Sequence, residues 1–143
     1  MQQIYCDSFP MKYLKLFPLT LVCLVVIWLL CFCTVPHTKL DNVPLIDKWT
    51  HLVMYAGMTS VFWFEYWRNI RHHVHISESV LWIISMVLPI LMSGLIEILQ
   101  ATCTGGRRSG EFLDFVANSI GVLVGLILGR TLIKMFVEKY THK

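Results

Sequence analysis

The stretch LFPLTLVCLVVIWLLCFCTV, residues Leu16 to Val35, decides the fold class of this chain because it carries no charged residue. Roughly 20 consecutive apolar residues form a helix long enough to cross the hydrocarbon core of a bilayer, about 30 Å thick. The run exceeds the roughly 7–15 apolar residues of a signal peptide, and no cleavage site of small residues follows it. Residues 1–10 are polar, so the true start is expected at Met1 or Met11. Leu16 to Val35 therefore predicts an uncleaved membrane-spanning helix.

Three further segments repeat this apolar pattern with few interruptions. They are Trp49–Trp67, which contains one histidine and one glutamate, Val80–Thr102, which contains one glutamate, and Phe112–Val137, whose charges lie near its two ends. We therefore predict an all-α fold, an integral membrane four-helix bundle that forms a single transmembrane domain over residues 1–143. The expected helices cover residues 14–35, 48–67, 79–102 and 111–137.

Composition and charge favour a membrane protein and predict its orientation. Apolar residues make up 56% of the chain and charged residues 15%, below the roughly 25% charged fraction of a soluble domain. The net charge of +3 comes from basic residues scattered at helix ends, so we expect membrane lipid as a partner and no nucleic acid. With the N-terminus in the cytoplasm, eight basic residues lie inside and four outside, which predicts N-in and C-in. The inner set is Lys12, Lys15, Arg68, Arg71, Arg130, Lys134, Lys139 and Lys143, and the outer set is Lys39, Lys48, Arg107 and Arg108.

Polar residues gather at the predicted outer ends of three helices, on one face of each. They are Asp47, His51 and Tyr55 on the second helix, Glu97 and Gln100 on the third, and Asp114 and Asn118 on the fourth. Acidic side chains in spanning helices usually face the bundle interior and pair with a cation. Arg108, or its neighbour Arg107, is the cation that the sequence offers to Glu97 and Asp114. We therefore expect one polar site at the outer membrane face.

The polar face of the fourth helix continues into a stripe of small residues, Gly121, Gly125 and Gly129. Such a stripe lets a neighbouring helix approach closely. We expect it to pack within the chain in preference to forming a dimer interface. Three local features are also expected, namely an N-cap by Asp47, a kink at Pro89 and an ion pair between Glu65 and Arg68.

Three short motifs together resemble those of the VanZ-like family of bacterial integral membrane proteins. The chain has DKWTHLVMYAGM from Asp47, EILQ from Glu97 and RRSGEFLDFVANSIG from Arg107, similar to the family pattern D-K-x-x-H-x-x-x-Y, E-x-x-Q and an arginine followed by D-x-x-x-N-x-x-G. The matching positions are Asp47, Lys48, His51, Tyr55, Glu97, Gln100, Arg108, Asp114, Asn118 and Gly121. The resemblance implies a multi-pass protein of the inner or cytoplasmic membrane of a bacterium. Because the family's namesake is associated with low-level resistance to the glycopeptide teicoplanin, it also implies a link to antibiotic resistance and the cell envelope.

Three roles for the polar cluster stay open from the sequence. The first is a purely structural charge lock, and the second is a binding site for a cell-envelope ligand such as a lipid-linked cell-wall precursor or a lipoglycopeptide. The third is a membrane enzyme acting on a lipid-linked or phosphorylated envelope substrate. In such an enzyme the carboxylates and the imidazole of the polar cluster would bind a divalent cation or transfer protons. These groups belong to Asp47, His51, Glu97 and Asp114. The chain has no H-E-x-x-H motif, no D-x-D pair and no nucleophile elbow, so no catalytic residue, metal or cofactor is assigned and a non-enzymatic role is favoured.

Overall fold

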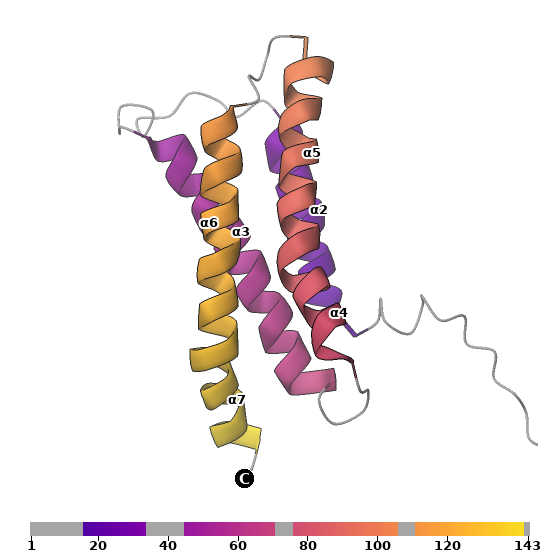
Figure 1. Ribbon diagram of the computed structural model, residues 1–143, viewed down its shortest axis with the longest axis vertical. Helices are drawn as coiled ribbons and strands as arrows, with labels where there is room; N and C mark the ends of the chain where they lie inside the picture. The colour runs from indigo at the N-terminus through magenta and orange to yellow at the C-terminus, as the bar shows by residue number, and fades with distance from the viewer. Residues whose placement is uncertain (1–15, 34–44, 71–75, 106–110, 142–143) are drawn as a thin grey trace, which may run out of the picture.

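The computed structural model describes residues 16–33, 45–70, 76–105 and 111–141, and the regular structure within these ranges is entirely helical. The predicted all-α class is thereby confirmed. Four helical segments run alternately up and down (Figure 1). They are α2 (Pro18–Phe32); α3 (Ile46–Glu65) with the π-helical turn η2 (Tyr66–Ile70); α4 (Glu78–Trp82), η3 (Ile83–Val87) and α5 (Leu88–Cys103); and α6 (Phe112–Leu128), η4 (Gly129–Ile133) and α7 (Lys134–Thr141). Residues 14–15 and 34–35, which the sequence assigns to the first helix, lie outside the described ranges.

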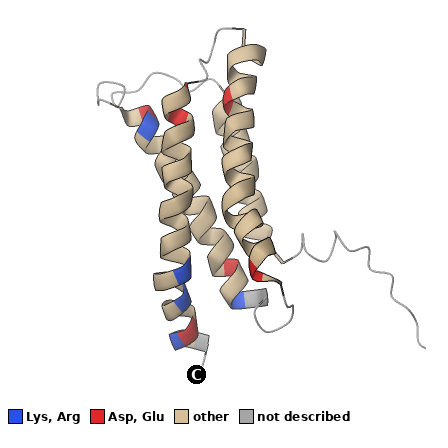
Figure 2. Ribbon diagram, viewed as in Figure 1, with Lys and Arg blue, Asp and Glu red and all other residues tan. Residues whose placement is uncertain are grey.

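The alternating order of the helices brings four helix termini to one end of the bundle, one of them the end of α2. There α3 begins, α5 ends and α6 begins, and Figure 1 shows α3 crossing obliquely behind α6 while α2 lies alongside α5. We call this the polar end, and define it by Asp47, Lys48, His51, Glu97 and Asp114. Figure 2 shows that Lys, Arg, Asp and Glu fall towards the two ends of the bundle and leave its middle uncharged. The fold therefore separates two charged zones by an apolar band.

The glycine stripe of α6 lies directly against α3. A Cβ atom on Gly121 would overlap the Leu52 carbonyl, and one on Gly125 would overlap the Ala56 carbonyl. Helix backbones that approach this closely leave no room for a side chain, which is the geometry that small residues permit. The contact is within the chain, and it fixes the register in which α6 presents its polar first turn to α3.

The irregularity at Pro89 takes the form of a π-helical turn. Proline has no N–H group, so the carbonyl four residues earlier, that of Ser85, loses its usual helical donor. The turn η3 ends two residues before the proline, and the N–H of Leu88, the residue after the turn, donates to the Ile83 carbonyl, five residues back. The Ser85 hydroxyl, which is buried, donates to the Leu81 carbonyl at 2.6 Å. Local hydrogen bonds of this kind let a spanning helix tolerate a proline.

The buried carboxylate of Glu65 closes the N-terminus of α2. It accepts hydrogen bonds from the Leu19 N–H at 2.8 Å, the Thr20 N–H at 2.9 Å and the Thr20 hydroxyl at 2.7 Å. The N-cap residue of α2, Phe17, provides no side-chain cap, so a residue of another helix satisfies these amides. The sequence pairs Glu65 with Arg68; in the structure the carboxylate is engaged by α2, and the Arg68 guanidinium lies over the Phe64 ring.

The described bundle buries polar side chains beside its apolar core and exposes large apolar side chains. Apart from Glu65, its buried polar side chains include His51, Ser93, Glu97, Gln100, Asp114 and Asn118. Its exposed large apolar side chains include Val25 and Leu29 on α2, Leu91 and Leu95 on α5, and Leu123 and Ile127 on α6. Two helical segments, Glu78–Cys103 and Phe112–Tyr140, are long and apolar enough to cross a membrane, and α2 is a shorter apolar helix.

Candidate functional site

Helix α3 brings three of the predicted residues to one face at its start. Its N-cap, Leu45, has a left-handed backbone conformation and no side-chain cap. The sequence predicted Asp47 as the N-cap, and this prediction is wrong. Asp47 lies in the first turn of α3, and its side chain is 54% exposed. His51 is buried, and Tyr55 is fully buried in the apolar core. The face thus runs from an exposed carboxylate, through a buried imidazole, to a buried phenol.

Lys48 is the described cation at the centre of the polar end. Its ammonium lies 2.5 Å from the Asp114 Oδ1 atom, 2.6 Å from the Glu111 Oε2 atom and 3.8 Å from the Asp47 Oδ2 atom. The Lys48 side chain is 18% exposed and that of Asp114 is 5% exposed, so this ion pair is largely shielded from water. Arg108, the cation that the sequence offers to Asp114, lies outside the described residues.

A chain of hydrogen bonds links the buried imidazole to helices α6 and α5. The His51 Nδ1 atom lies 3.1 Å from the Asn118 Oδ1 atom, and the Asn118 amide nitrogen donates to the Ser93 hydroxyl at 2.8 Å. The Nε2 atom of His51 faces the Asp47 Oδ1 atom at 3.9 Å. All three members of the chain are buried. Asn118 thus joins the site, as the i, i+4 spacing with Asp114 predicts, while Ser93 is an additional member.

Glu97 contributes a carboxylate that is only half satisfied. Its Oε2 atom accepts a hydrogen bond from the Glu111 N–H at 3.1 Å, whereas its Oε1 atom, which is buried, has no hydrogen-bond partner among the described residues. The residue is 7% exposed and interacts electrostatically with Asp114, His51 and Lys48. An unsatisfied buried oxygen costs about 1–3 kcal/mol, so this atom marks a place where a ligand donor would be stabilised.

Gln100 shares a face with Glu97 but plays a different part. Its side-chain amide donates to the Cys31 carbonyl at 2.8 Å, and its backbone carbonyl accepts from the Thr104 hydroxyl at 2.7 Å. The first bond ties α5 to the end of α2. Gln100 therefore links α5 to α2, and its described hydrogen bonds do not involve Lys48 or Asp114.

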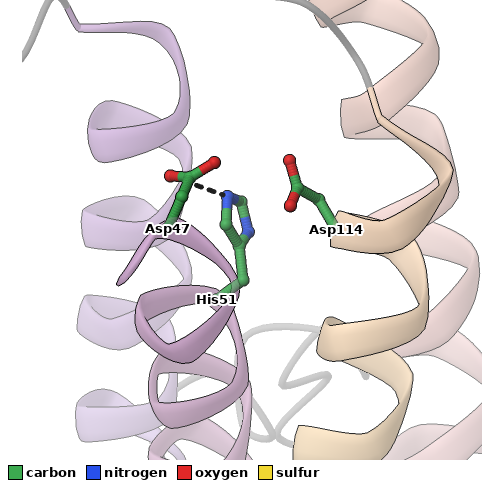
Figure 3. A group of neighbouring side chains, drawn as sticks. All are labelled: Asp47, His51 and Asp114. Carbon is green, nitrogen blue, oxygen red and sulfur yellow. Dashed lines mark ion pairs between the residues drawn. The ribbon is translucent and has the colours of Figure 1, made fainter. Parts of the chain in front are cut away.

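Asp47, His51 and Asp114 point towards one another across the gap between α3 and α6 (Figure 3). One potential ligand atom from each of the three residues lies within 4.8 Å of the other two. Oxygen and imidazole nitrogen are donors that divalent transition-metal ions accept. The group is therefore both an acidic, hydrogen-bonding surface and a possible ligand set.

The structure adds three residues that the sequence does not place in the site. They are Lys48, Glu111 and Ser93. In the sequence analysis Lys48 is only a position that matches the family pattern. Glu111 directly precedes α6, and the Ser93 hydroxyl accepts the hydrogen bond of the Asn118 amide. A signal for Ser93 exists, because Ser93, Glu97 and Gln100 follow one another at i, i+4 and i+7 on one helix face.

An apolar cavity of about 300 Å³ lies in the other half of the bundle. It is lined by residues of α2, α3, η3 and α5, among them Leu24, Met58 and Pro89, and the buried Thr59 hydroxyl on its wall has no hydrogen-bond partner among the described residues. None of the polar-end residues lines it. The polar end and the cavity are therefore separate features.

Comparison with known families gives a match that covers most of the chain. Residues 9–134 match the VanZ/LLP1 family. The chain belongs to the VanZ/LLP1 family. The resemblance carried by the three short motifs is thereby confirmed. No curated protein and no solved structure matches this chain.

The match places the whole polar end inside the VanZ/LLP1 domain. Residues 9–134 include all four helical segments up to the first residue of α7, and they include Arg107 and Arg108 in the range that the structure does not describe. The polar end is therefore part of the VanZ/LLP1 domain and is not an appendage to it.

Proposed function

We propose that this VanZ/LLP1 protein is a multi-pass protein of the bacterial cell membrane whose polar end binds a cell-envelope ligand. The apolar exterior of the bundle and its buried polar groups support the membrane placement. Large apolar side chains cover the outside of α2, α5 and α6, while carboxylate, amide and imidazole groups are buried. Exposed apolar surface of this extent marks contact with lipid or with a partner, and polar residues in spanning helices face the bundle interior.

The distribution of basic residues supports an outward-facing polar end. Among the described residues, Arg68, Arg130, Lys134 and Lys139 lie at the opposite end, whereas Lys48 lies at the polar end. Under the positive-inside rule the more basic end lies in the cytoplasm. This orientation is N-in and C-in, and it directs the polar end to the cell envelope.

The main support for a binding site is that the buried Glu97 Oε1 atom has no hydrogen-bond partner among the described residues. Around it, the described carboxylates of Asp47, Glu97, Glu111 and Asp114 outnumber the single ammonium of Lys48. This surplus of hydrogen-bond acceptors favours a ligand that brings N–H donors or positive charge. The partly exposed Asp47 carboxylate gives such a ligand access from outside.

A lipoglycopeptide such as teicoplanin fits this chemistry. Glycopeptides carry amide and amine N–H groups, and a lipid chain would hold the molecule at the membrane face beside the polar end. A lipid-linked cell-wall precursor carries phosphate, for which Lys48 is the cation that the described part of the polar end offers. We therefore favour teicoplanin as the ligand, with reduced susceptibility to this drug as the consequence.

The experiment compares wild type, Glu97→Gln and Glu78→Gln in a susceptible bacterium. Teicoplanin and vancomycin susceptibility are measured together with the amount of each protein in the membrane. The Glu97→Gln side chain keeps one carbonyl oxygen to accept the Glu111 N–H, so the fold is retained while the negative charge is lost. Glu78 lies at the opposite end, 71% exposed and paired with Arg130, and serves as the matched control. We expect wild type and Glu78→Gln to lower teicoplanin susceptibility and Glu97→Gln not to do so.

Two results would reject the proposal. The first is an unchanged teicoplanin susceptibility on expression of abundant wild-type protein. The second is a Glu97→Gln variant that protects as well as wild type. A selective effect on teicoplanin over vancomycin would support a role for the lipid chain.

A structural charge lock is the second candidate, because Lys48 on α3 pairs with Asp114 on α6. Such a lock supplies helix association that apolar burial does not supply in lipid. If it is the whole role of the cluster, membrane abundance and protection fall in step in every polar-end variant. Loss of protection by Glu97→Gln at constant abundance excludes that reading.

A further inference from the structure

The hydrogen-bond chain at His51 places a proton on one of its two ring nitrogens. The Asn118 amide nitrogen donates to the Ser93 hydroxyl, so the Asn118 Oδ1 atom is the one that faces the ring. A carbonyl oxygen only accepts, and the His51 Nδ1 atom must therefore be the donor. In a neutral imidazole the proton on Nδ1 leaves a lone pair on Nε2.

That lone pair points at a negatively charged group. The Nε2 atom faces the Asp47 Oδ1 atom at 3.9 Å, which is too long for a hydrogen bond. A nitrogen lone pair opposite a carboxylate is repulsive, and either a proton on Nε2 or a metal ion between the two groups removes that repulsion. Two ligands of one tetrahedral metal ion, each about 2.0–2.2 Å from the metal, lie roughly 3.3–3.6 Å apart, so the two side chains would move slightly closer to bind one ion.

The remaining parts of a metal site are also present. Asp114 supplies a third ligand atom within 4.8 Å of the other two. The Asn118–Ser93 pair orients the imidazole from behind, as the outer partners of a metal-bound histidine do. Independently of these groups, Glu97 is 7% exposed, its Oε1 atom has no hydrogen-bond partner in the described ranges, and it interacts electrostatically with His51 and Asp114.

Lys48 competes with a bound cation. Its ammonium contacts the Oδ1 atom of Asp114 and the Oε2 atom of Glu111 and lies 3.8 Å from the Oδ2 atom of Asp47, so it repels a metal ion at this position. Within the described ranges no hydrogen bond involves the second oxygen of Asp114 or the imidazole Nε2 atom, and the Asp47 carboxylate is partly exposed. Removing the ammonium would leave the buried Asp114 carboxylate without its described counter-charge, which a metal ion would then restore.

We propose that the Asp47 carboxylate, the His51 Nε2 atom and the Asp114 carboxylate bind a divalent transition-metal ion of the Zn²⁺ class. The imidazole donor favours this class over Mg²⁺ and Ca²⁺, which prefer oxygen ligands throughout. Three protein ligands leave a fourth position of a tetrahedral ion for water or for an oxygen of an envelope molecule. The inference goes beyond teicoplanin binding and does not depend on it.

The test is a Zn²⁺ titration of the purified full-length protein in detergent, after treatment with a chelator, by calorimetry and by elemental analysis. Asp47→Asn is the key variant, because Asp47 is partly exposed and its replacement leaves the buried network intact. We expect wild type to bind one more equivalent of zinc than Asp47→Asn and than His51→Ala. Comparing equivalents subtracts any zinc held by the histidines at positions 72, 73 and 75, which all the variants keep.

Three further variants sharpen the result. Asn118→Ala should weaken zinc binding about 10-fold, the lower range for loss of an outer-shell partner. Lys48→Met should bind zinc more tightly than wild type, because the competing ammonium is gone. Glu78→Gln, remote from the site, should bind as wild type does. Circular dichroism of each variant confirms that it is folded.

Equal zinc stoichiometry in wild type, Asp47→Asn and His51→Ala overturns the inference. So does a Lys48→Met variant that retains its helicity and binds zinc no more tightly than wild type. Because no envelope ligand enters this titration, its failure is distinguishable from failure of the proposed function. If the protein binds teicoplanin but no zinc at this site, the metal-site proposal is rejected and the proposed function is not.

Discussion

The Lys48 ammonium lies 2.5 Å from the Asp114 carboxylate and ties the first turn of α3 to the first turn of α6. The same ammonium contacts Glu111, which directly precedes α6. A single side chain thus joins two helices whose backbones already touch further down through the glycines of α6. The polar end and the glycine contact together hold α6 in one register on α3.

This ion pair predicts strong coupling between its two members. We expect both variants to destabilise the protein, because Lys48→Met leaves the buried Asp114 carboxylate without its described counter-charge and Asp114→Asn removes one of the two close carboxylates of Lys48. The double variant should lose less than the sum of the two, by about 1–3 kcal/mol. Thermal unfolding in detergent of wild type, the two single variants and the double variant measures this coupling. Strictly additive losses of stability would show that the ion pair does not stabilise the protein.

The glycine contact predicts different responses at two glycines. Gly121→Ala would force its new Cβ atom into the Leu52 carbonyl, and we expect a loss of about 1–3 kcal/mol, as for an overpacked core. Gly57→Ala meets open space within α3, and we expect it to stabilise the helix by roughly 0.5–1 kcal/mol. Thermal unfolding of both variants checks the pair. A Gly121→Ala variant as stable as Gly57→Ala would contradict the close approach of α3 and α6.

The cap that Glu65 provides predicts local protection of α2. Glu65→Gln keeps one acceptor oxygen and loses the charge, so the Leu19 and Thr20 amides should exchange their hydrogens faster. Hydrogen exchange followed by mass spectrometry, on a peptide covering the start of α2, measures this. Glu78→Gln at the same end of the bundle should leave the rate unchanged. Equal exchange rates in Glu65→Gln and wild type would contradict the role of the Glu65 charge as a cap of α2.

Cys103 reports the side of the membrane on which the polar end lies. It is exposed at the end of α5. In a variant whose other cysteines are replaced by serine, a membrane-impermeant maleimide should label it in intact cells. A cysteine placed at the exposed position 140 of α7, in a background without other cysteines, should react only after permeabilisation. The reverse pattern would overturn the N-in, C-in orientation.

Helix number and helix faces were predictable from the sequence because both depend on local periodicity. Apolar runs give four helices, and i, i+3 and i+4 spacings place Asp114 and Asn118 on the face that continues into Gly121. The motif resemblance then joins faces that lie far apart in the sequence. The family match and the all-α fold agree with that part of the analysis.

The partners of individual side chains were not predictable, because contacts between helices depend on rotation and depth. The turn arginine was the expected counter-charge of Asp114, whereas the described partner is Lys48, from a helix more than sixty positions earlier. Likewise Glu65 had a near neighbour in Arg68, yet its carboxylate bonds to α2 across 45 and 46 positions. Asp47 lies in the first turn rather than at the N-cap, since the left-handed residue Leu45 begins the helix.

The central claim is that the half-satisfied Glu97 carboxylate belongs to an envelope-ligand site. Its most direct test is the affinity of teicoplanin for the purified protein in lipid nanodiscs, measured for wild type, Glu97→Gln and Glu78→Gln. We predict saturable binding by wild type and Glu78→Gln, and affinity at least about 10-fold weaker for Glu97→Gln, the loss of one charge-assisted hydrogen bond. Absence of saturable binding by wild type, or equal affinity in all three proteins, would contradict the claim.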